Sequence, residues 1–260
     1  MSQQFLHGKT ALITGSTSGI GLGLARALAG AGANIVINGF GDHQHAKEIV
    51  EGLGVKSMFH PADMRSSTDI EDMMKQAFNH FGHIDILVNN AGIQHVAPIE
   101  HFPTEKWNDV IAINLTSAFH TTRLALPGMR SANWGRIINV ASVHGLVGSA
   151  EKSAYVAAKH GIVGFTKVTA LETATTGITC NAICPGWVLT PLVQKQVDAK
   201  AQQFNISNEE AQRLLLSEKE PSMQFTTPDE LGELALFFCT QAASNVRGVA
   251  WNMDGGWTAQ

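Results

Sequence analysis

The chain has 260 residues and a net charge of −4, with 44% hydrophobic and 15% charged residues. The length fits one large α/β domain, the apolar fraction argues against disorder, and the negative balance argues against a nucleic-acid binder. The first residues lack a basic segment followed by an apolar one, and no apolar run approaches about 20 residues, so we expect no secretory leader, no membrane span and a cytoplasmic location.

Strand-like and helix-like segments alternate along the chain. Apolar runs at residues 9–14 and 34–38 flank an amphipathic segment at 22–31, which predicts a strand-helix-strand unit. Further strand-like runs lie at 57–60, 84–89, 135–140, 178–183 and 249–253, and helix-like segments at 67–81, 104–126 and 154–174. This alternation predicts one α/β domain over residues 1–260, with a doubly wound parallel sheet of the Rossmann type.

Residues 187–220 depart from this alternation, because they carry helical patterns and no strand. One apolar stripe consists of Leu192, Val193, Val197, Ala201 and Phe204, and a second helical pattern covers 208–216. Thr227, Pro228 and Glu230 then have the spacing of a capped helix start. A helical insertion after a strand's carboxyl end lies where such sheets bind ligands, so we expect 187–220 to form a lid.

A glycine-rich segment, Thr14-Gly15-Ser16-Thr17-Ser18-Gly19-Ile20-Gly21, connects the first strand to the first helix. Glycines allow a sharp turn and close approach of a pyrophosphate to a helix N-terminus. The alternative is a purely structural turn. Asp63 and the Asn89-Asn90-Ala91-Gly92 segment follow two other strands, where they are either cofactor contacts or ordinary turn residues.

Tyr155 is the single tyrosine of the chain, and Lys159 follows it by four residues. Residues four apart share one face of a helix, so both side chains can reach one bound ligand. A free phenol, with a pKa near ~10, is a poor base at neutral pH, and a neighbouring ammonium lowers that pKa. The pair predicts a proton-transfer device, with Ser142 upstream as a candidate partner.

Taken in order, the TGSTSGIG loop, the NNAG segment, Asn114, Ser142 and Tyr155-x3-Lys159 resemble the motif series of the short-chain dehydrogenase/reductase family over almost the whole chain. The resemblance implies that Tyr155 is the general acid/base and that Ser142 holds the substrate oxygen. It implies that Lys159 binds the nicotinamide ribose and lowers the pKa of the phenol, and that Asn114 positions a water in a proton relay.

The cofactor is expected to be NAD. A 2′-phosphate needs cationic partners near the end of the second strand, yet no Lys or Arg occurs from Asn34 until Lys47, and Asp42 would repel a phosphate. The resemblance implies that Pro185 and Gly186 face the nicotinamide and that Thr190 lies near its carboxamide. The residues expected to contact the cofactor are Gly15, Thr17, Ser18, Gly19, Ile20, Gly21, Phe40, Ala62, Asp63, Asn90, Gly92, Tyr155, Lys159, Pro185, Gly186, Val188 and Thr190.

The substrate is expected to be a small hydroxy or keto acid. Segments around Gln94, His144, Lys152, Trp187 and Trp257 resemble those family members that oxidise D-3-hydroxybutyrate to acetoacetate. A carboxylate needs a cation and hydrogen-bond donors, and the residues expected to supply them are Gln94, His144, Lys152 and the lid residue Gln196. Ser142 and Tyr155 would contact the reacting oxygen, and Trp187 and Trp257 would exclude water.

Several of these residues could instead have an ordinary structural or surface role. Lys152 has the alternative of a solvated lysine, His144 that of a structural imidazole, and Trp257 that of a subunit contact. Alternative functions are another short-chain reductase, acting on a 3-oxoacyl group or a small alcohol, or a dinucleotide-sensing regulator that would not need the Ser-Tyr-Lys set. The three cysteines are expected to be buried free thiols, and we predict no metal site. The resemblance implies a homotetramer.

Overall fold

The computed structural model describes residues 4–259, so the first three residues, which contribute to the expectation about a leader, lie outside the described residues. Seven strands form one sheet in the order β3-β2-β1-β4-β5-β6-β7, and every neighbouring pair is parallel. The chain winds outward from β1 to β3 and then returns to place β4 beside β1, which creates a switch point between them. The strands are β1 Thr10–Ile13, β2 Asn34–Asn38, β3 Ser57–His60, β4 Ile86–Asn89, β5 Gly135–Val140, β6 Ile178–Pro185 and β7 Ala250–Met253.

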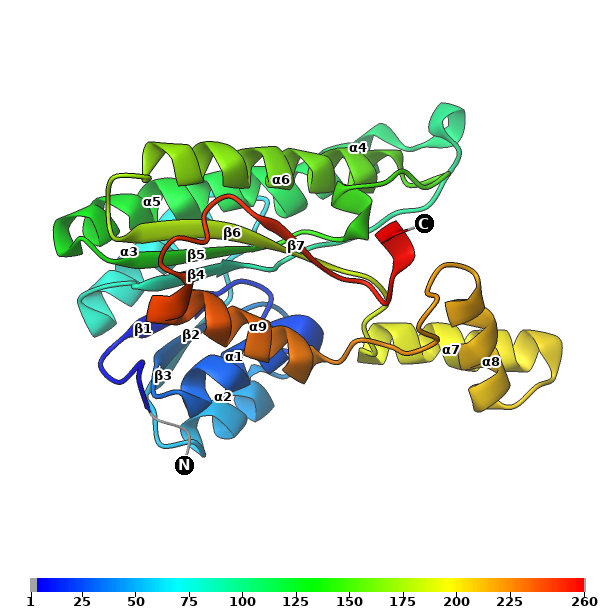
Figure 1. Ribbon diagram of the computed structural model, residues 1–260, viewed down its shortest axis with the longest axis horizontal. Helices are drawn as coiled ribbons and strands as arrows, with labels where there is room; N and C mark the ends of the chain where they lie inside the picture. Colours follow the sequence, from blue (N-terminus) through cyan, green and yellow to red (C-terminus); the bar gives the residue numbers. More distant parts are fainter. Residues whose placement is uncertain (1–3, 260) are drawn as a thin grey trace.

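Helices cover both faces of this sheet, as Figure 1 shows. One face carries α1 Gly19–Gly30, α2 His43–Glu51 and α9 Pro228–Cys239, and the other carries α3 Ser67–Phe81, α4 Thr104–Ile111, α5 Ser117–Ala132 and α6 Ser153–Glu172. The doubly wound Rossmann-type fold is therefore confirmed. Short 3-10 turns are Ile99–His101, Val143–Gly145, Gln241–Ala243 and Trp257–Ala259.

Helices α1 and α9 pack closely because glycines face each other across their contact. A Cβ added to Gly23 would lie 2.5 Å from the Cβ of Pro228, and one added to Gly232 would lie 2.7 Å from the Cβ of Ala27. Separate apolar cores fill the two sides of the sheet, built on alternate residues of the same strands. Ile13 and Leu12, for example, belong to opposite cores.

Two local features differ from the sequence prediction. The expected helix over 104–126 is divided by a π-helical turn, Ala112–Thr116, between α4 and α5. Such wide turns within helices are often found at functional sites, and this one carries Asn114. Helix α2 was not predicted, because it is short and buries only Ala46 and Val50.

The insertion after β6 contains two helices, α7 Pro191–Phe204 and α8 Asn208–Ser217, which stand apart at one end of the molecule (Figure 1). They share a small core of Val193, Val197, Ala201, Ala211 and Leu215. Leu192 and Phe204, predicted in the same stripe, are 70% and 52% exposed, so that part of the prediction is wrong. The start of α9 is as predicted, with Pro228 at N1 and a capping box between Thr227 and Glu230.

The cysteines behave as expected, since Cys180, Cys184 and Cys239 are buried free thiols. Within residues 4–259, no helix combines the length and the apolar character needed to cross a membrane.

Candidate active site

A cavity of about 780 Å³ lies over the carboxyl ends of the strands, between the switch point and the insertion. Every residue predicted to contact cofactor or substrate lines it, from Gly15 in the glycine loop to Trp257 near the C-terminus. Asn114 is the one predicted site residue outside this lining. Several further lining residues adjoin the motifs and were not predicted, namely Asn38, Gly39, Met64, Ala91, Ile93, Val96, Ile113, Val140, Ala141, Val143, Pro191, Leu192 and Val193.

The glycine loop leads from β1 into the N-terminus of α1 at one end of the cavity. Gly15 and Gly19 have φ angles of +65° and +55°, which favour glycine. A Cβ on Gly21 would lie 2.2 Å from the carbonyl oxygen of Gly15, so the loop folds tightly only because that side chain is missing. The first turn of α1 carries no acidic residue, so its amide groups and helix dipole suit a phosphate group.

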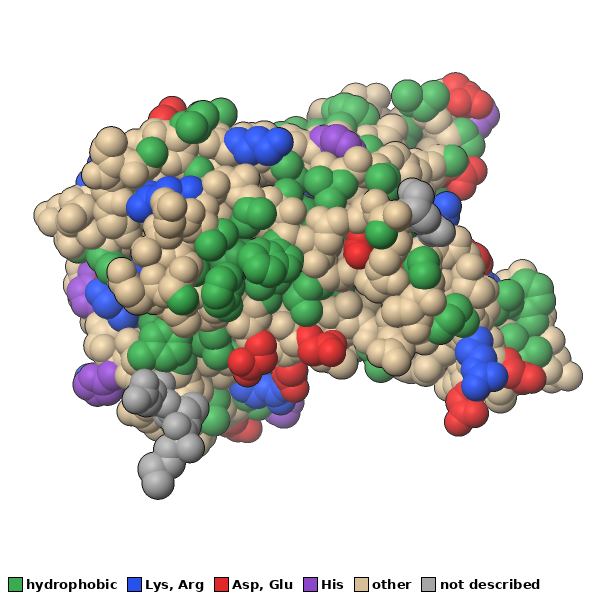
Figure 2. Space-filling view, in the orientation of Figure 1, with side chains coloured by type: hydrophobic (Ala, Val, Ile, Leu, Met, Phe, Trp, Pro, Cys, Tyr) green, Lys and Arg blue, Asp and Glu red, His purple; other side chains and the backbone are tan. Residues whose placement is uncertain are grey.

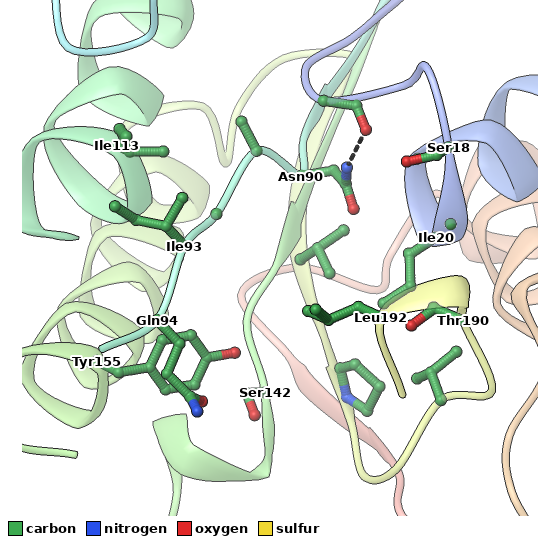
Figure 3. Close-up of a pocket in the computed structure, with 18 of the residues that line it drawn as sticks. Ser18, Ile20, Asn90, Ile93, Gln94, Ile113, Ser142, Tyr155, Thr190 and Leu192 are labelled. Carbon is green, nitrogen blue, oxygen red and sulfur yellow. Dashed lines mark hydrogen bonds between the residues drawn. The ribbon is translucent and has the colours of Figure 1, made fainter. Parts of the chain in front are cut away.

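Hydrogen bonds fix this loop to the neighbouring strands. The Oγ1 of Thr14 accepts from the backbone N–H groups of Asn90 and Ala91, both at 3.0 Å. The side-chain amide of Asn90 donates to the carbonyl oxygens of Thr14 and Gly15, at 2.8 and 3.1 Å, the second of which is drawn in Figure 3. The loops after β1 and β4 therefore form one rigid wall of the cavity.

The tip of β2 forms the adjoining wall. Asn38 accepts from the backbone N–H of Gly15 at 3.2 Å, and Thr17 donates through Oγ1 to the carbonyl oxygen of Phe40 at 2.6 Å. Phe40 is 71% exposed and presents its ring without a packing partner in the core. Asp42 accepts from the backbone N–H of His45 and so caps α2. Among the described lining residues, no Lys or Arg lies at this end of the cavity.

Asp63 borders the same end. Its carboxylate binds Arg65, with an Oδ2 to Nη2 distance of 2.6 Å. The guanidinium and backbone N–H of Arg65 lower the pKa of Asp63 below its ordinary value. Asp63 is therefore an ionised acceptor at the rim of the cavity.

Asn114 lies behind the cavity wall, where it clamps the segment after β4. Its Oδ1 accepts from the backbone N–H of Ile93 at 2.9 Å, and its Nδ2 donates to the carbonyl oxygen of the same residue at 3.0 Å. These two bonds use the amide group of Asn114 to hold the main chain next to Gln94. The π-helical turn is what brings this buried side chain to face Ile93.

The hydroxyl groups of Tyr155 and Ser142 point into the other end of the cavity, with the amide of Gln94 beside them (Figure 3). Helix α6 carries Tyr155, and the turn after β5 carries Ser142. The Oγ of Ser142 accepts from the backbone N–H of His144 at 3.2 Å. Burial raises the pKa of Tyr155 above its ordinary value, and a hydrogen bond with Ser142 acts in the opposite direction.

Lys159 follows Tyr155 by four residues on α6, and its ammonium is bound to the main chain of β5. Its Nζ donates to the carbonyl oxygen of Val140 at 2.7 Å and lies 5.6 Å from the centroid of the Tyr155 ring. Burial lowers the pKa of Lys159 to about 8, because the charged form is costly in this environment. Burial is therefore the larger influence on the phenol here.

His144 and Lys152 flank the phenol on the side facing the insertion. Burial, together with the charge of Lys152, lowers the pKa of His144 to about 4, so its imidazole is neutral at physiological pH. Its Nε2 is buried and has no hydrogen-bond partner among the described residues. Its ring meets those of Tyr155 and Trp257 edge to face, at centroid distances of 5.8 and 5.4 Å.

Burial also lowers the pKa of Lys152, which stands at the N-cap of α6. No carboxylate within residues 4–259 lies at salt-bridge distance from its ammonium. A half-buried cation without a counter-ion, beside an imidazole with a free nitrogen, suits an anionic ligand.

The remaining predicted residues close the cavity on two sides. Gln94 and Gln196 are exposed and line it from the segment after β4 and from α7, and Trp187 lines it from the start of the insertion. Leu192 and Thr190 lie across from Tyr155 (Figure 3). Thr190 also approaches the glycine loop, since a Cβ on Gly19 would lie 3.5 Å from its Cγ2.

Comparison with known proteins agrees with this architecture. A family model described as short chain dehydrogenase matches residues 9–201. The chain is 70% identical to a D-beta-hydroxybutyrate dehydrogenase of Cupriavidus necator, over 98% of this chain and 100% of that protein. It is 52% identical to one of Rhizobium meliloti, over 97% and 99%. A solved structure of an actinorhodin polyketide ketoreductase with NADPH is similar over the full length of both chains, with a TM-score of 0.90 and 35% identity.

Proposed function

The chain belongs to the short-chain dehydrogenase family, and from this premise we propose that it catalyses the reversible oxidation of D-3-hydroxybutyrate to acetoacetate with NAD. The observation that carries the proposal is the pairing, within one cavity, of the Tyr155 and Ser142 hydroxyls with a cation, Lys152, that has no counter-ion among residues 4–259. The similarity to two D-beta-hydroxybutyrate dehydrogenases supports the same substrate. The test is NADH formation from this acid.

The first half of the mechanism concerns the hydroxyl group. Ser142 and Tyr155 would both bind the oxygen on C3 of the substrate, and ionised Tyr155 would accept its proton as the carbonyl group forms. When bound, NAD would supply the acceptor for the hydride that leaves C3. Lys159 would bind the ribose hydroxyls and stabilise the phenolate through them, while Asn114 would take part in a water-mediated proton relay.

The second half concerns the carboxylate. Lys152 would supply the charge, and the free Nε2 of neutral His144 would donate a hydrogen bond if the proton of the imidazole is held there. Gln94 and Gln196 would contribute amide donors from opposite sides of the cavity. Trp187 and Trp257 would exclude water from the reacting carbon.

Cofactor selection follows from the end of the cavity around the glycine loop. The pyrophosphate would bind at Gly15 and Gly19 and at the N-terminus of α1, and Phe40 and Asp63 would flank the adenosine part. Pro185, Gly186, Val188 and Thr190 would contact the nicotinamide end. The absence of Lys and Arg among the described lining residues near Phe40 supports NAD over NADP.

Residues 187–220 would act as a lid. The two connections of the insertion pair with each other, because Leu189 donates to Thr226 and Thr226 donates to Trp187, both at 2.9 Å. This paired base and the separate small core of α7 and α8 suit motion of the insertion as a unit. Closure would bring Gln196 to the carboxylate and exclude water.

The enzyme would assemble as a homotetramer. Figure 2 shows an apolar patch over α9 and β7, and Trp251, 40% exposed, packs there against Phe237 and Phe238. Leu171 and Val168 on α6, at 77% and 52% exposed, form part of a second apolar face on the opposite side of the sheet. Exposed apolar surface at two separate places suits association through two interfaces.

A further inference from the structure

Glu220 is a buried carboxyl group that the chemistry proposed above does not use. It lies three residues after the end of α8 and is 1% exposed. Its backbone N–H donates to the carbonyl oxygen of Leu216 at 2.7 Å, and its own carbonyl oxygen accepts from the N–H of Met223 at 3.0 Å. The side chain is therefore fixed at the point where the insertion returns to the sheet.

The first segment that Glu220 contacts is the start of the insertion. Its Oε1 accepts a hydrogen bond from the backbone N–H of Trp187. A Cβ on Gly186 would lie 2.1 Å from the same oxygen, so glycine at this position is what allows the carboxyl group to approach. The main chain that carries Trp187 is thus held directly by Glu220.

The second segment is the C-terminal turn that carries Trp257. A Cβ on Gly255 would lie 3.4 Å from Oε2 of Glu220, and Ser222 donates to the carbonyl oxygen of Gly255 at 2.9 Å. Trp187 and Trp257 both line the cavity, on segments that are separated in the sequence. The carboxyl group of Glu220 lies between those two segments.

The charges around Glu220 favour its neutral form. Its Oε2 is buried and has no hydrogen-bond partner among the described residues. Asp254 approaches from the C-terminal turn, where its carboxylate already accepts from the N–H groups of Gly256 and Thr258. Burial and the charge of Asp254 raise the pKa of Glu220 to about 7, although the bond from Trp187 acts in the opposite direction. Lys219, the adjacent cation, is exposed.

We propose that Glu220, through its contacts with both segments, is a positioning residue that sets the distance between Trp187 and Trp257 and thereby the fit of the substrate in the cavity. The inference deepens the proposed function and rests on it for the identity of the substrate. Ionisation of Glu220 would add a second buried negative charge beside Asp254 and displace the two tryptophan segments. Substrate binding is then weakened above neutral pH, while the proton-transfer group is untouched.

The kinetic test compares Glu220→Gln, Glu220→Ala and the matched control Glu218→Gln at pH 6 and pH 8.5. Glu218 is two residues away, with a side chain 53% exposed and bound to Lys200. At pH 6 we expect Glu220→Ala to raise KM for 3-hydroxybutyrate roughly three- to tenfold above that of the unmodified enzyme, with a smaller change in kcat. The KM of the unmodified enzyme and of Glu218→Gln should rise between the two pH values, and that of Glu220→Gln should stay level.

A KM for Glu220→Ala equal to that of the unmodified enzyme at pH 6 overturns the inference. A rise of KM between pH 6 and pH 8.5 in Glu220→Gln that equals the rise in the unmodified enzyme also overturns it. A second measurement needs no substrate and separates this inference from the proposed function. Tryptophan emission of the unmodified enzyme should change with a midpoint near pH 7. Glu220→Gln should abolish the change, and Trp187→Phe should reduce it. If 3-hydroxybutyrate is not oxidised, the proposed function fails, and this titration alone decides whether Glu220 positions Trp187. Tryptophan emission of the unmodified enzyme that does not change with pH would contradict the positioning role of Glu220.

Discussion

Lys159 lies beneath Tyr155, with its Nζ 5.6 Å from the centroid of the phenol ring. The ammonium donates to the carbonyl oxygen of Val140 at 2.7 Å, and burial lowers its pKa to about 8. The lysine is therefore close enough to influence the phenol but is held by the main chain of β5. Tyr155 remains the group with a hydroxyl directed into the cavity, next to Ser142 (Figure 3).

Replacing Tyr155 by Phe removes this hydroxyl and keeps the ring. We expect kcat for oxidation of 3-hydroxybutyrate to fall at least ~10²–10⁴-fold, the usual contribution of a general acid/base. NADH binding, measured by fluorescence titration, should change less than about threefold, because the loop between β1 and α1 is untouched. Near-normal turnover by Tyr155→Phe would remove the basis of the proposed mechanism.

Replacing Lys152 by Ala removes the cation near the phenol, which has no carboxylate partner within residues 4–259. A hydrogen bond to a charged group contributes roughly 1.5–3 kcal/mol, so KM for the acid should rise about 10- to 100-fold, and kcat should change less. Lys167→Ala is a matched control, because Lys167 lies on the same helix, is exposed and does not line the cavity. Unchanged steady-state constants in Lys152→Ala would show that Lys152 does not bind the carboxylate.

The region around Phe40 determines the expected cofactor preference. The unmodified enzyme should use NAD with a kcat/KM at least roughly 100-fold above that for NADP, since no cation of the described lining is there to pair with a 2′-phosphate. Phe40→Arg should raise kcat/KM for NADP about tenfold or more. Phe204→Arg, an exposed residue outside the cavity, is the control. Equal use of both cofactors by the unmodified enzyme would contradict this preference.

Glu220 also predicts how stability depends on pH. Its pKa is about 7 in the folded protein and near its ordinary 4.5 when unfolded, so the folded state holds the proton more tightly. The resulting stabilisation is fully present below pH 4.5, declines as pH rises and is lost above pH 7. The difference corresponds to roughly 3 kcal/mol as an upper limit.

As pH rises from 4.5 to 7, the melting temperature of Glu220→Gln should therefore increase relative to that of the unmodified protein. Above pH 7, the difference between the two melting temperatures should stay constant. Thermal unfolding at several pH values measures this, with Glu218→Gln as the control for loss of an exposed carboxylate. Curves that stay parallel for Glu220→Gln and the unmodified protein would exclude a raised pKa at this position.

The fold was predictable because apolar runs and glycines mark each strand and its carboxyl end. Long periodic segments such as α3 and α6 were found within a few residues of their bounds. Helix α2 was missed because it is short, with nine residues of which only Ala46 and Val50 are buried. The π-helical turn at Asn114 has no pattern of its own, since it inserts into an otherwise continuous amphipathic segment.

Site residues that belong to a sequence motif were predictable. Residues whose position depends on tertiary packing were harder to predict. The residues named for cofactor and substrate contact all line one cavity, although their individual roles stay predictions. Leu192 was placed in one apolar stripe with Val193 and Val197, but the helix turns it toward the cavity. The burial of Glu220 depends on Gly186 and on a turn about 35 residues further along the chain, so nothing in its local sequence, Lys219-Glu220-Pro221, indicates it.

The most direct test is the initial rate of NADH formation, followed by absorbance, with D-3-hydroxybutyrate and NAD. The L enantiomer, NADP and, in the reverse direction, a 3-oxoacyl thioester serve as comparisons. We expect rapid NADH formation from the D acid with NAD, loss of that activity in Tyr155→Phe, and acetoacetate reduction that exceeds thioester reduction. No turnover of the D acid by an enzyme that reduces the thioester would contradict this expectation.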